Sequence, residues 1–438
     1  SILCFYVFLA LNMSAGDTDL ADPICRKLTA SEQQWLPQTS LISLCARLSD
    51  SAASKVDLES LREASLFCRR KNPFLNVKIN SQELTFERND GIPVEEERLD
   101  SDEMPVVRKA LQEQLERGID RSVSLARVAL LNGPNCTHLV VLGDHLCFDG
   151  KSFMYWTGEI LTTILNKEER KEGEMLPFVD WTTLIPEQTF SPFSPVFESI
   201  MLKTAPAEPS ALATSFVEDV VCTIDKKLFA DLKAAAKANG SKLNAPLMIA
   251  YFAAMADACL RLEPEKGQDR PLKVRSVCAV DLRQTLGLPS SYMNNSASVV
   301  PVHTEFANVS NGTVVGDLWE LAKQAQNVML ENVEKGEAYR LNDMTKRGAF
   351  HEFAPYFAIL CLWSNMGVCS VPDGTVENVE VHIRGVGNNP IISAHPIAVG
   401  DALNVTFSYG PLLHDRETVE FISERFQAHL RSLATCKE

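Results

Sequence analysis

Apolar residues in the first half of the chain recur at two spacings, one typical of helices and the other of strands. Residues 58–68 carry apolar side chains three or four positions apart, and Asp57 can cap that helix. Residues 76–87 alternate between apolar and polar positions, which predicts paired strands. A second helix is predicted over residues 104–117 and a strand over residues 123–131. The first half is therefore predicted to be mixed α/β.

The second half of the chain begins with the same kinds of element. Residues 216–224 predict a strand, and the helix that follows begins at Asp225 and ends at Gly240. The next helix, over residues 244–262, is apolar on nearly all sides and is therefore predicted to be buried. The last predicted elements are a strand over residues 403–409 and a closing helix capped by Asp415.

A stretch rich in proline and serine, residues 179–215, separates the two halves. Such composition disfavours regular structure, and 438 residues are many for one core. Residues 1–12 are apolar but too few to span a bilayer, which takes about 20 residues. They fit either the remnant of a signal peptide or sequence upstream of a start at Met13. The chain is therefore divided into a leader (1–13), an N-terminal domain (14–178), a linker (179–215) and a C-terminal domain (216–438).

Candidate chemistry follows the apolar run of residues 139–142, which predicts a buried strand ended by Gly143. His145 comes directly after that strand. A histidine there can act as a base, because its pKa is near neutral and the strand fixes the direction of its ring. Asp149 lies four residues further on, and Gly150 lets the backbone pass where a side chain would obstruct it.

The residues Asp144-His145-Leu146-Cys147-Phe148-Asp149-Gly150 resemble the His-His-x-x-x-Asp-Gly signature of the acyltransferases with the chloramphenicol-acetyltransferase-like fold. This group includes the condensation domains of nonribosomal peptide synthesis, the alcohol acetyltransferases and a plant branch. The second histidine of the signature is the catalytic one, which the resemblance assigns to His145. Asp144 stands where many members carry histidine. The resemblance implies an α/β chain of two α+β sandwich domains with mixed sheets and an active-site tunnel between them.

Two later stretches resemble further parts of the family pattern. Residues 280–286 resemble Val-Asp-x-Arg-x-x-Leu, a region whose arginine pairs with the motif aspartate. The resemblance thus implies that Arg283 pairs with Asp149, which shapes the loop; the alternative is a surface Arg283. Residues 362–367 resemble a Ser-Asn-x-Gly stretch of the condensation and alcohol-acetyltransferase branches. There, Ser364 and Asn365 either donate to a developing oxyanion or cap the strand end.

These resemblances imply an acyltransferase that moves an acyl group from a thioester, acyl-CoA first of all, to a hydroxyl acceptor. His145 would be the general base, and no covalent enzyme intermediate is needed. Cys147 raises the competing idea of a thiol nucleophile, but it occupies a position that the family leaves variable. The Asp-Phe-Gly-Trp-Gly motif of the plant branch is absent, so the alcohol acetyltransferases and condensation domains are the nearer branches. The alternatives are an amide-forming condensation enzyme with a carrier-bound donor and a non-catalytic relative that binds a ligand.

Charge limits the partners of the chain. A formal net charge of -15 argues against binding to nucleic acid or to an anionic membrane. Coenzyme A is polyanionic and needs a local basic pocket, for which Lys346-Arg347, Arg340 and Lys226-Lys227 are candidates, unless they are ordinary solvated charges. The expected partners are a small-molecule acyl donor, an alcohol or amine acceptor and, in the carrier-dependent case, an acyl carrier protein. Stable membrane insertion is not expected, and the chain is expected to be a monomer.

The 12 cysteines are scattered singly without a Cys-x-x-Cys pair, so neither a metal nor a resident cofactor is expected. Cysteines within apolar runs favour a reducing compartment. The glycosylation sequons at Asn135 and Asn404 adjoin or enter predicted strands, which favours a cytoplasmic location. His395, directly before Pro396, is the candidate for a second site among the remaining histidines.

Overall fold

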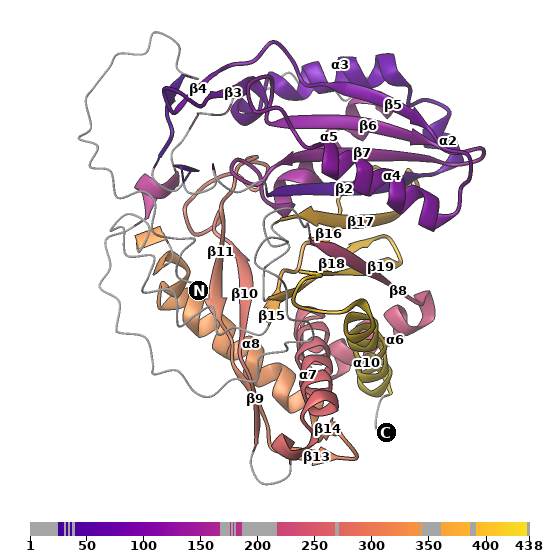
Figure 1. The fold of residues 1–438 in the computed structure, drawn as a ribbon, viewed down its shortest axis with the longest axis vertical. Coiled ribbons are helices and arrows are strands. Elements are labelled where there is room, and N and C mark those ends of the chain that lie inside the picture. The colour runs from indigo at the N-terminus through magenta and orange to yellow at the C-terminus, as the bar shows by residue number, and fades with distance from the viewer. Residues whose placement is uncertain are drawn as a thin grey trace.

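The computed structural model describes residues 25–29, 32–33, 36, 40–166, 176, 178, 181–185, 217–267, 271–340, 342–343, 361–385 and 391–435. These residues form two large sheets, each covered by helices (Figure 1). The leader and most of the predicted linker lie outside the described residues, although Trp181–Leu184 forms one short 3-10 helix. The mixed α/β class predicted from the sequence is confirmed.

The N-terminal sheet has five strands. Their spatial order is β17 (Val376–Arg384), β2 (Leu41–Leu48), β7 (Thr137–Asp144), β6 (Ala126–Asn132) and β5 (Val94–Arg98). Side chains alternate between the two faces, so one face packs on α3 (Leu58–Arg69) and α5 (Gly150–Leu165), and the other on α4 (Met104–Arg117). Beside it lie the small sheet of β1 (Arg26–Lys27), β4 (Thr85–Arg88) and β3 (Val77–Asn80), α2 (Asp50–Ala53) and the 3-10 helix Pro73–Asn76.

The strand that carries the motif continues beyond the predicted end. Gly143 was expected to end it, but β7 runs on to Asp144. A Cβ atom added at Gly143 would lie 2.9 Å from the rings of both Phe148 and Phe153. The glycine therefore makes room for two aromatic rings against the strand, and strand pairing continues through it.

The C-terminal sheet is also mixed. Its strands, in spatial order, are β11 (Ala297–Pro301), β10 (Ser276–Asp281), β15 (Cys361–Trp363), β18 (Ile392–Val399), β19 (Ala402–Tyr409) and β8 (Glu218–Ile224), with β16 (Gly367–Val368) also paired to β18. The short pairs β9 (Leu272–Val274) with β12 (Thr304–Phe306) and β13 (Asn308–Ser310) with β14 (Thr313–Val315) extend from it. The helices of this half are α6 (Lys226–Ala238), α7 (Asn244–Leu262), α8 (Leu318–Glu334) and α10 (Arg416–Ala434), with 3-10 turns at Pro264–Gly267 and Glu337–Tyr339.

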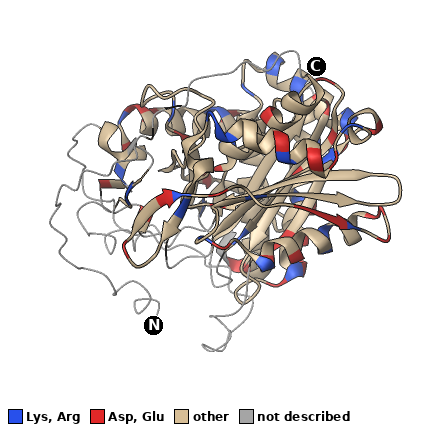
Figure 2. Ribbon diagram, turned by 90° about the horizontal axis from the view of Figure 1, so that it is seen from above, with Lys and Arg blue, Asp and Glu red and all other residues tan. Residues whose placement is uncertain are grey.

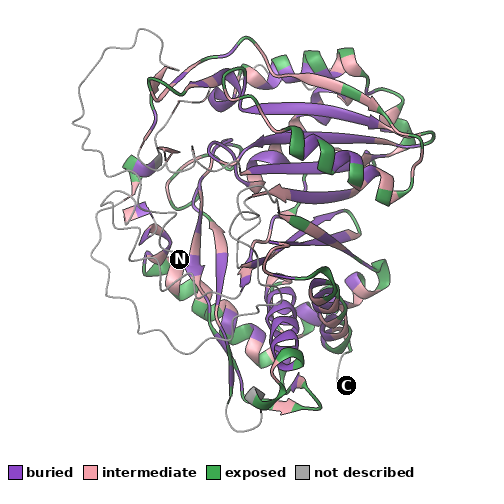
Figure 3. Cartoon of the chain, in the orientation of Figure 1, coloured by how far each residue is buried: buried purple, intermediate pink, exposed green. Residues whose placement is uncertain are grey.

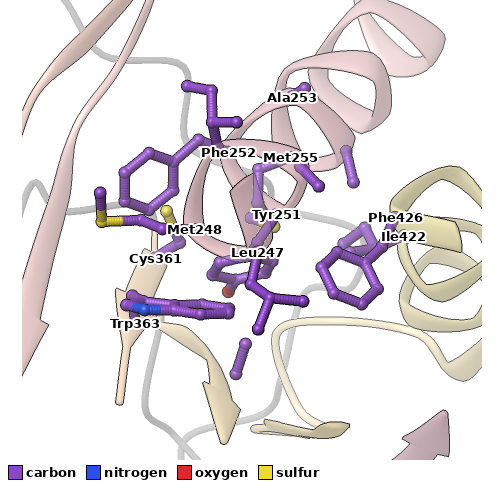
Figure 4. Close-up of a cluster of buried hydrophobic side chains, with 14 of the residues drawn as sticks. Leu247, Met248, Tyr251, Phe252, Ala253, Met255, Cys361, Trp363, Ile422 and Phe426 are labelled. Atoms are coloured by element: carbon purple, nitrogen blue, oxygen red, sulfur yellow. The ribbon is translucent and has the colours of Figure 1, made fainter. Parts of the chain in front are cut away.

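Helix α7 forms the centre of the C-terminal core, as its uniform apolarity predicted. Tyr251 packs on Trp363 of β15 (Figure 4) and on Phe407 of β19. Its hydroxyl donates to the carbonyl of Ile392 at 2.6 Å. By length and composition α7 could cross a membrane, but 89% of its apolar window is buried inside the protein. Its apolar surface is therefore used in the core, and Figure 3 shows it buried along most of its length.

One strand crosses the division predicted from the sequence. β17 comes from the second half of the chain, yet it pairs antiparallel with β2 from Val376 to Arg384. Figure 1 shows this gold strand beside the indigo β2, at the edge of the N-terminal sheet nearest the C-terminal sheet. β17 follows residues 179–215 in sequence, but its hydrogen bonds to β2 place it in the N-terminal sheet. The predicted boundary therefore does not assign this strand to the correct sheet.

A buried charge network joins β17 to the C-terminal sheet. His382 contacts Asp219 of β8 at 3.0 Å through Nδ1 and Glu380 at 3.2 Å through Nε2. Arg108 of α4 donates to the other oxygen of Glu380 at 2.8 Å. Burial opposes a charge on His382, but the hydrogen bonds to the two carboxylates outweigh it and raise the pKa of His382 to about 9.

This network predicts a loss of stability in mild alkali. The pKa of His382 lies above the value of about 6.5 expected in the unfolded chain, so its contribution is complete below pH 6.5 and is lost as the pH rises through 9. We expect the free energy of unfolding to fall by on the order of 3 kcal/mol between pH 6.5 and 9.5. Urea unfolding at both pH values measures this. His382→Gln should remove most of the difference; an equal pH dependence in both proteins would contradict the assignment.

Candidate active site

The loop after β7 holds His145 at three points. Its backbone N–H donates to the carbonyl of Ser40 at 2.9 Å, and its own carbonyl accepts from Asn295 Nδ2 at 2.6 Å. Nδ1 of the ring lies 2.9 Å from the carbonyl of Phe148. A carbonyl can only accept, so Nδ1 carries the hydrogen and Nε2 carries the lone pair of the neutral ring.

Burial lowers the pKa of His145, although the Phe148 carbonyl and the carboxylates of Asp149 and Asp144 partly oppose this shift. The ring is therefore neutral near pH 7. A neutral, oriented imidazole with its lone pair on Nε2 is the form that a general base requires.

Asp149 and Arg283 form a buried, bidentate ion pair. Arg283 Nη1 donates to Asp149 Oδ2 at 2.8 Å and Nη2 to Oδ1 at 2.9 Å, and both side chains are at most 3% exposed. Asp149 also caps α5 by accepting from the N–H of Ser152, and it accepts from the N–H of Ser296. Burial alone would raise the pKa of Asp149, but Arg283 holds it below its usual value. The predicted pairing is thus present, and it occupies both carboxylate oxygens.

The segment before β11 supports this loop and was not predicted from the sequence. Arg283 also donates to the carbonyls of Tyr292 and Asn294, each at 2.7 Å. Asn295 bonds the carbonyl of His145, and Ser296 bonds Asp149. The sequence mark of this segment is its run of three polar residues, Asn294 to Ser296, immediately before an apolar strand. Such a run resembles an ordinary turn, so its role emerges only from the tertiary contacts.

Asp144, the departure from the family signature, has a partner of its own. Arg121 Nε lies 2.5 Å from Asp144 Oδ2, and the N–H of Leu146 donates to Oδ1 at 3.0 Å. The carboxylate therefore fixes the start of the loop that carries His145. Although this position does not carry the family's histidine, the charged Asp144 still holds the loop of the catalytic candidate His145 in place.

Restoring the commoner histidine at this position is expected to destabilise the protein. Asp144→His removes the carboxylate from Arg121, whose side chain is 16% exposed, and should cost about 1–3 kcal/mol of unfolding free energy. Asp144→Asn keeps an acceptor for the Leu146 N–H and should cost less. Urea unfolding of the three proteins measures both effects, and a histidine variant as stable as the wild type would show that the ion pair contributes nothing.

The segment from Ser364 to Gly367 lies against the motif. A Cβ atom added at Gly150 would come within 2.0 Å of Met366 Sδ, so only glycine fits there without displacing Met366. Asn365 donates through Nδ2 to Asn244 at 2.6 Å and accepts from the N–H of Gly367 at 2.8 Å. These bonds match the alternative in which Asn365 caps the strand end. The N–H of Ser364 donates to the carbonyl of Ala394 at 2.9 Å, which places Ser364 beside β18.

The remaining candidates contribute less. The thiol of Cys147 is buried, and burial raises its pKa well above the usual value, which opposes a thiolate nucleophile. Lys226 and Lys227 pair with surface carboxylates, and Arg340 pairs with Glu337. Figure 2 shows basic and acidic residues interspersed on the outer helices. Lys346-Arg347 lies outside the described residues, and within those residues no group of acidic, histidine and cysteine side chains is arranged to hold a metal.

Neither a protein-family model nor a curated protein sequence matches this chain. Solved structures do match it over nearly its whole length. TRI3 trichothecene 15-O-acetyltransferase from Fusarium sporotrichioides superposes with a TM-score of 0.66 at 14% identity, covering 94% of each chain. The chain has the chloramphenicol-acetyltransferase-like fold.

Two further structures with this chloramphenicol-acetyltransferase-like fold are similar to the chain. The first condensation domain of the calcium-dependent antibiotic synthetase has a TM-score of 0.64 at 14% identity, covering 94% of this chain and 96% of that one. Polyketide synthase associated protein 5 from Mycobacterium tuberculosis has a TM-score of 0.61 at 15% identity, covering 94% and 98%. The fold expected from the motif is therefore confirmed.

Proposed function

We propose that this protein transfers an acyl group from a thioester, most simply acyl-CoA, to a hydroxyl acceptor. The observation that carries the proposal is the geometry of His145, whose Nδ1 hydrogen is held by the carbonyl of Phe148. That bond leaves the lone pair on Nε2 of a neutral ring, as proton abstraction from an alcohol requires. The solved structures of the same fold include an O-acetyltransferase, which supports an acyl-transfer reaction.

In the proposed reaction, His145 Nε2 takes the proton of the acceptor hydroxyl as its oxygen attacks the thioester carbonyl. The carbon–oxygen bond forms, and the carbonyl electrons become an oxyanion. Collapse of this tetrahedral species breaks the carbon–sulfur bond, and the imidazolium returns its proton to the leaving thiolate. The products are an ester and a free thiol, and His145 ends in its starting state.

Several side chains near His145 are bonded to each other, which restricts the roles that they can have in the reaction. Asp149 and Arg283 satisfy each other, so they keep the loop in place without contacting substrate. Each polar end of the Asn365 side chain makes one bond within the protein. Ser364, backbone N–H groups near Gly150 and the second N–H of Asn365 Nδ2 are the proposed donors for the oxyanion. The substrates would meet at His145 in a tunnel between the two domains.

A carrier-bound donor and an amine acceptor form the second candidate. The similarity to a condensation domain favours it, because the same base can deprotonate an amine. The chemistry at His145 is the same in both functions, so the donor distinguishes them. The first function uses free acyl-CoA, and the second uses an acylated carrier protein.

The test is release of free thiol by the purified chain. We would supply acetyl-CoA and longer acyl-CoAs with a panel of alcohols and amines, and in parallel an acylated carrier protein with the same acceptors. Acceptor-dependent thiol release from acyl-CoA is expected, with an ester as product. Release from the carrier alone would support the condensation function. No release from either donor would overturn both and favour a ligand-binding relative without activity.

A further inference from the structure

The C-terminal sheet turns a polar face toward the N-terminal sheet. Ser393 and His395 of β18 lie directly opposite Ser408 and Thr406 of β19, so these four side chains share one face. Asn404 lies further along that face and donates to a β17 carbonyl at 2.7 Å, which shows that the face points toward β17. The opposite face carries apolar residues that pack on α7 and α10. Polar side chains are thus buried between the two sheets.

Two contacts of Ser393 favour one tautomer of His395. The hydroxyl of Ser393 lies 3.4 Å from the carbonyl of Ser408, to which it can only donate. Ser393 Oγ therefore accepts from His395 Nε2–H, which lies 2.8 Å away. Nδ1 of His395 is left as a hydrogen-bond acceptor. Burial, with the nearby charges of His145 and His382, lowers the pKa of His395 to about 3, so the ring is neutral.

Three polar atoms on this face have no partner among the described residues. They are Nδ1 of His395, a residue 2% exposed, Oγ1 of Thr406, a residue fully buried, and, further along, Oδ1 of Asn404. Buried polar atoms in proteins are nearly always bonded, and each that is not costs stability. His395 and Thr406 lie opposite each other in the β18–β19 register, so one ligand group could contact both. A hydroxyl or an amine suits this pair, because it can donate to Nδ1.

Backbone contacts place His395 next to the candidate active site. The N–H groups of Ser364 and Met366 donate to the carbonyls of Ala394 and Pro396, on either side of His395. Met366 in turn contacts the Gly150 position of the motif. Met366 thus contacts both the motif that carries His145 and the strand that carries His395.

We propose that His395 Nδ1, with the hydroxyl of Thr406, binds a second hydroxyl or amino group on the acceptor. The acceptor class is then a diol, a polyol or an amino alcohol. One hydroxyl of this acceptor is deprotonated by His145, and a second donor is bound by His395. This inference rests on the proposed function, since it takes the acceptor to be bound at His145.

Binding of matched small alcohols tests the proposal without turnover. We would measure, by calorimetry, the dissociation constants of 1-hexanol, of 1,2-, 1,3- and 1,4-hexanediol, and of 2-amino-1-hexanol. One neutral hydrogen bond corresponds to roughly a two- to tenfold gain in affinity. The wild type should therefore bind at least one difunctional compound more tightly than 1-hexanol by about that factor.

Variants assign this preference to His395. His395→Leu removes the acceptor and should reduce the preference to about one, whereas His395→Asn can return an amide oxygen near the Nδ1 position and should keep part of it. Thr406→Val, which keeps the shape of the side chain, should also lower it. His138→Leu is the matched control, because His138 is a buried histidine of β7 whose Nε2 is likewise unpartnered among the described residues. It should leave the preference unchanged.

Failure of this inference is separable from failure of the proposed function. Equal binding of mono- and difunctional alcohols by the wild type, no binding of any of them, or a preference that survives in His395→Leu would overturn the role of His395. His145-dependent thiol release with monofunctional alcohols would still support acyl transfer in that case. Conversely, a diol preference that depends on His395 in a protein without thiol release would keep the binding site and overturn the acyltransferase proposal.

Discussion

Replacing His145 with alanine should lower acyl transfer by about 10²- to 10⁴-fold, the usual contribution of a general base. The variant loses the lone pair that accepts the acceptor's proton, whereas the groups that hold the loop remain. Asp149 still pairs with Arg283, and Asn295 donates to the backbone carbonyl of residue 145, which alanine retains. Thiol release under saturating donor and acceptor measures the effect, with the midpoint of thermal unfolding as the check on folding.

Cys147→Ala is the control for the competing thiol mechanism. Its thiol is buried and held in the protonated form by the raised pKa, so its loss should leave thiol release within a few fold of the wild type. If Cys147→Ala loses activity and His145→Ala keeps it, the roles assigned to the two residues are reversed. If both variants keep full activity, another part of the chain supplies the base.

Breaking the Asp149–Arg283 pair should cost about 3–5 kcal/mol of unfolding free energy, the range typical of a buried ion pair that loses one partner. Arg283→Met leaves the Asp149 carboxylate buried with the N–H groups of Ser152 and Ser296 and the Ser152 hydroxyl as its donors. Asp149→Asn leaves the guanidinium with only the partly exposed carboxylate of Asp281 as its counter-charge. Either change also loosens the loop of His145, so thiol release should fall along with stability. Urea unfolding at pH 7 measures the first effect.

The double variant distinguishes pairing from simple loss of packing. Asp149→Asn with Arg283→Met removes both charges, so it should cost less than the sum of the single changes. Asp231→Asn serves as the control, because it breaks the exposed Lys227–Asp231 pair on α6 and should leave stability unchanged within error. Additive effects at Asp149 and Arg283 would mean that the two side chains contribute independently, against the bidentate geometry.

Local patterns in the sequence were sufficient to predict most helices and many strands. α4 spans the predicted residues 104–117, and the side chains of Asp57, Asp225 and Asp415 cap helices as expected. Capping and helical spacing depend on residues within one or two turns, so they are visible in the chain itself. The pairing of β17 with β2 has no such local mark, because it joins segments far apart in sequence.

The candidate site was predictable only where a motif names its residues. The motif led to His145, Asp149 and, through the resemblance, to Arg283. Asn295 escaped because an asparagine in a polar run looks like a turn residue until the backbone of His145 is found beside it. The site at His395 was likewise not predictable. It depends on an unpartnered ring nitrogen and on the register between β18 and β19, and neither can be read from the sequence.

The crossing of β17 also affects how the chain must fold as it is made. Until residue 384 has been synthesised, β2 has no neighbour on one side, and its unpaired backbone groups form an open edge. At the usual 5–20 residues per second, this edge stays open for roughly tens of seconds after β2 itself has been made. Open edges of apolar strands are sites of aggregation. We therefore expect β2 to need protection in the nascent chain, by a chaperone or by later segments, long after the N-terminal residues are complete.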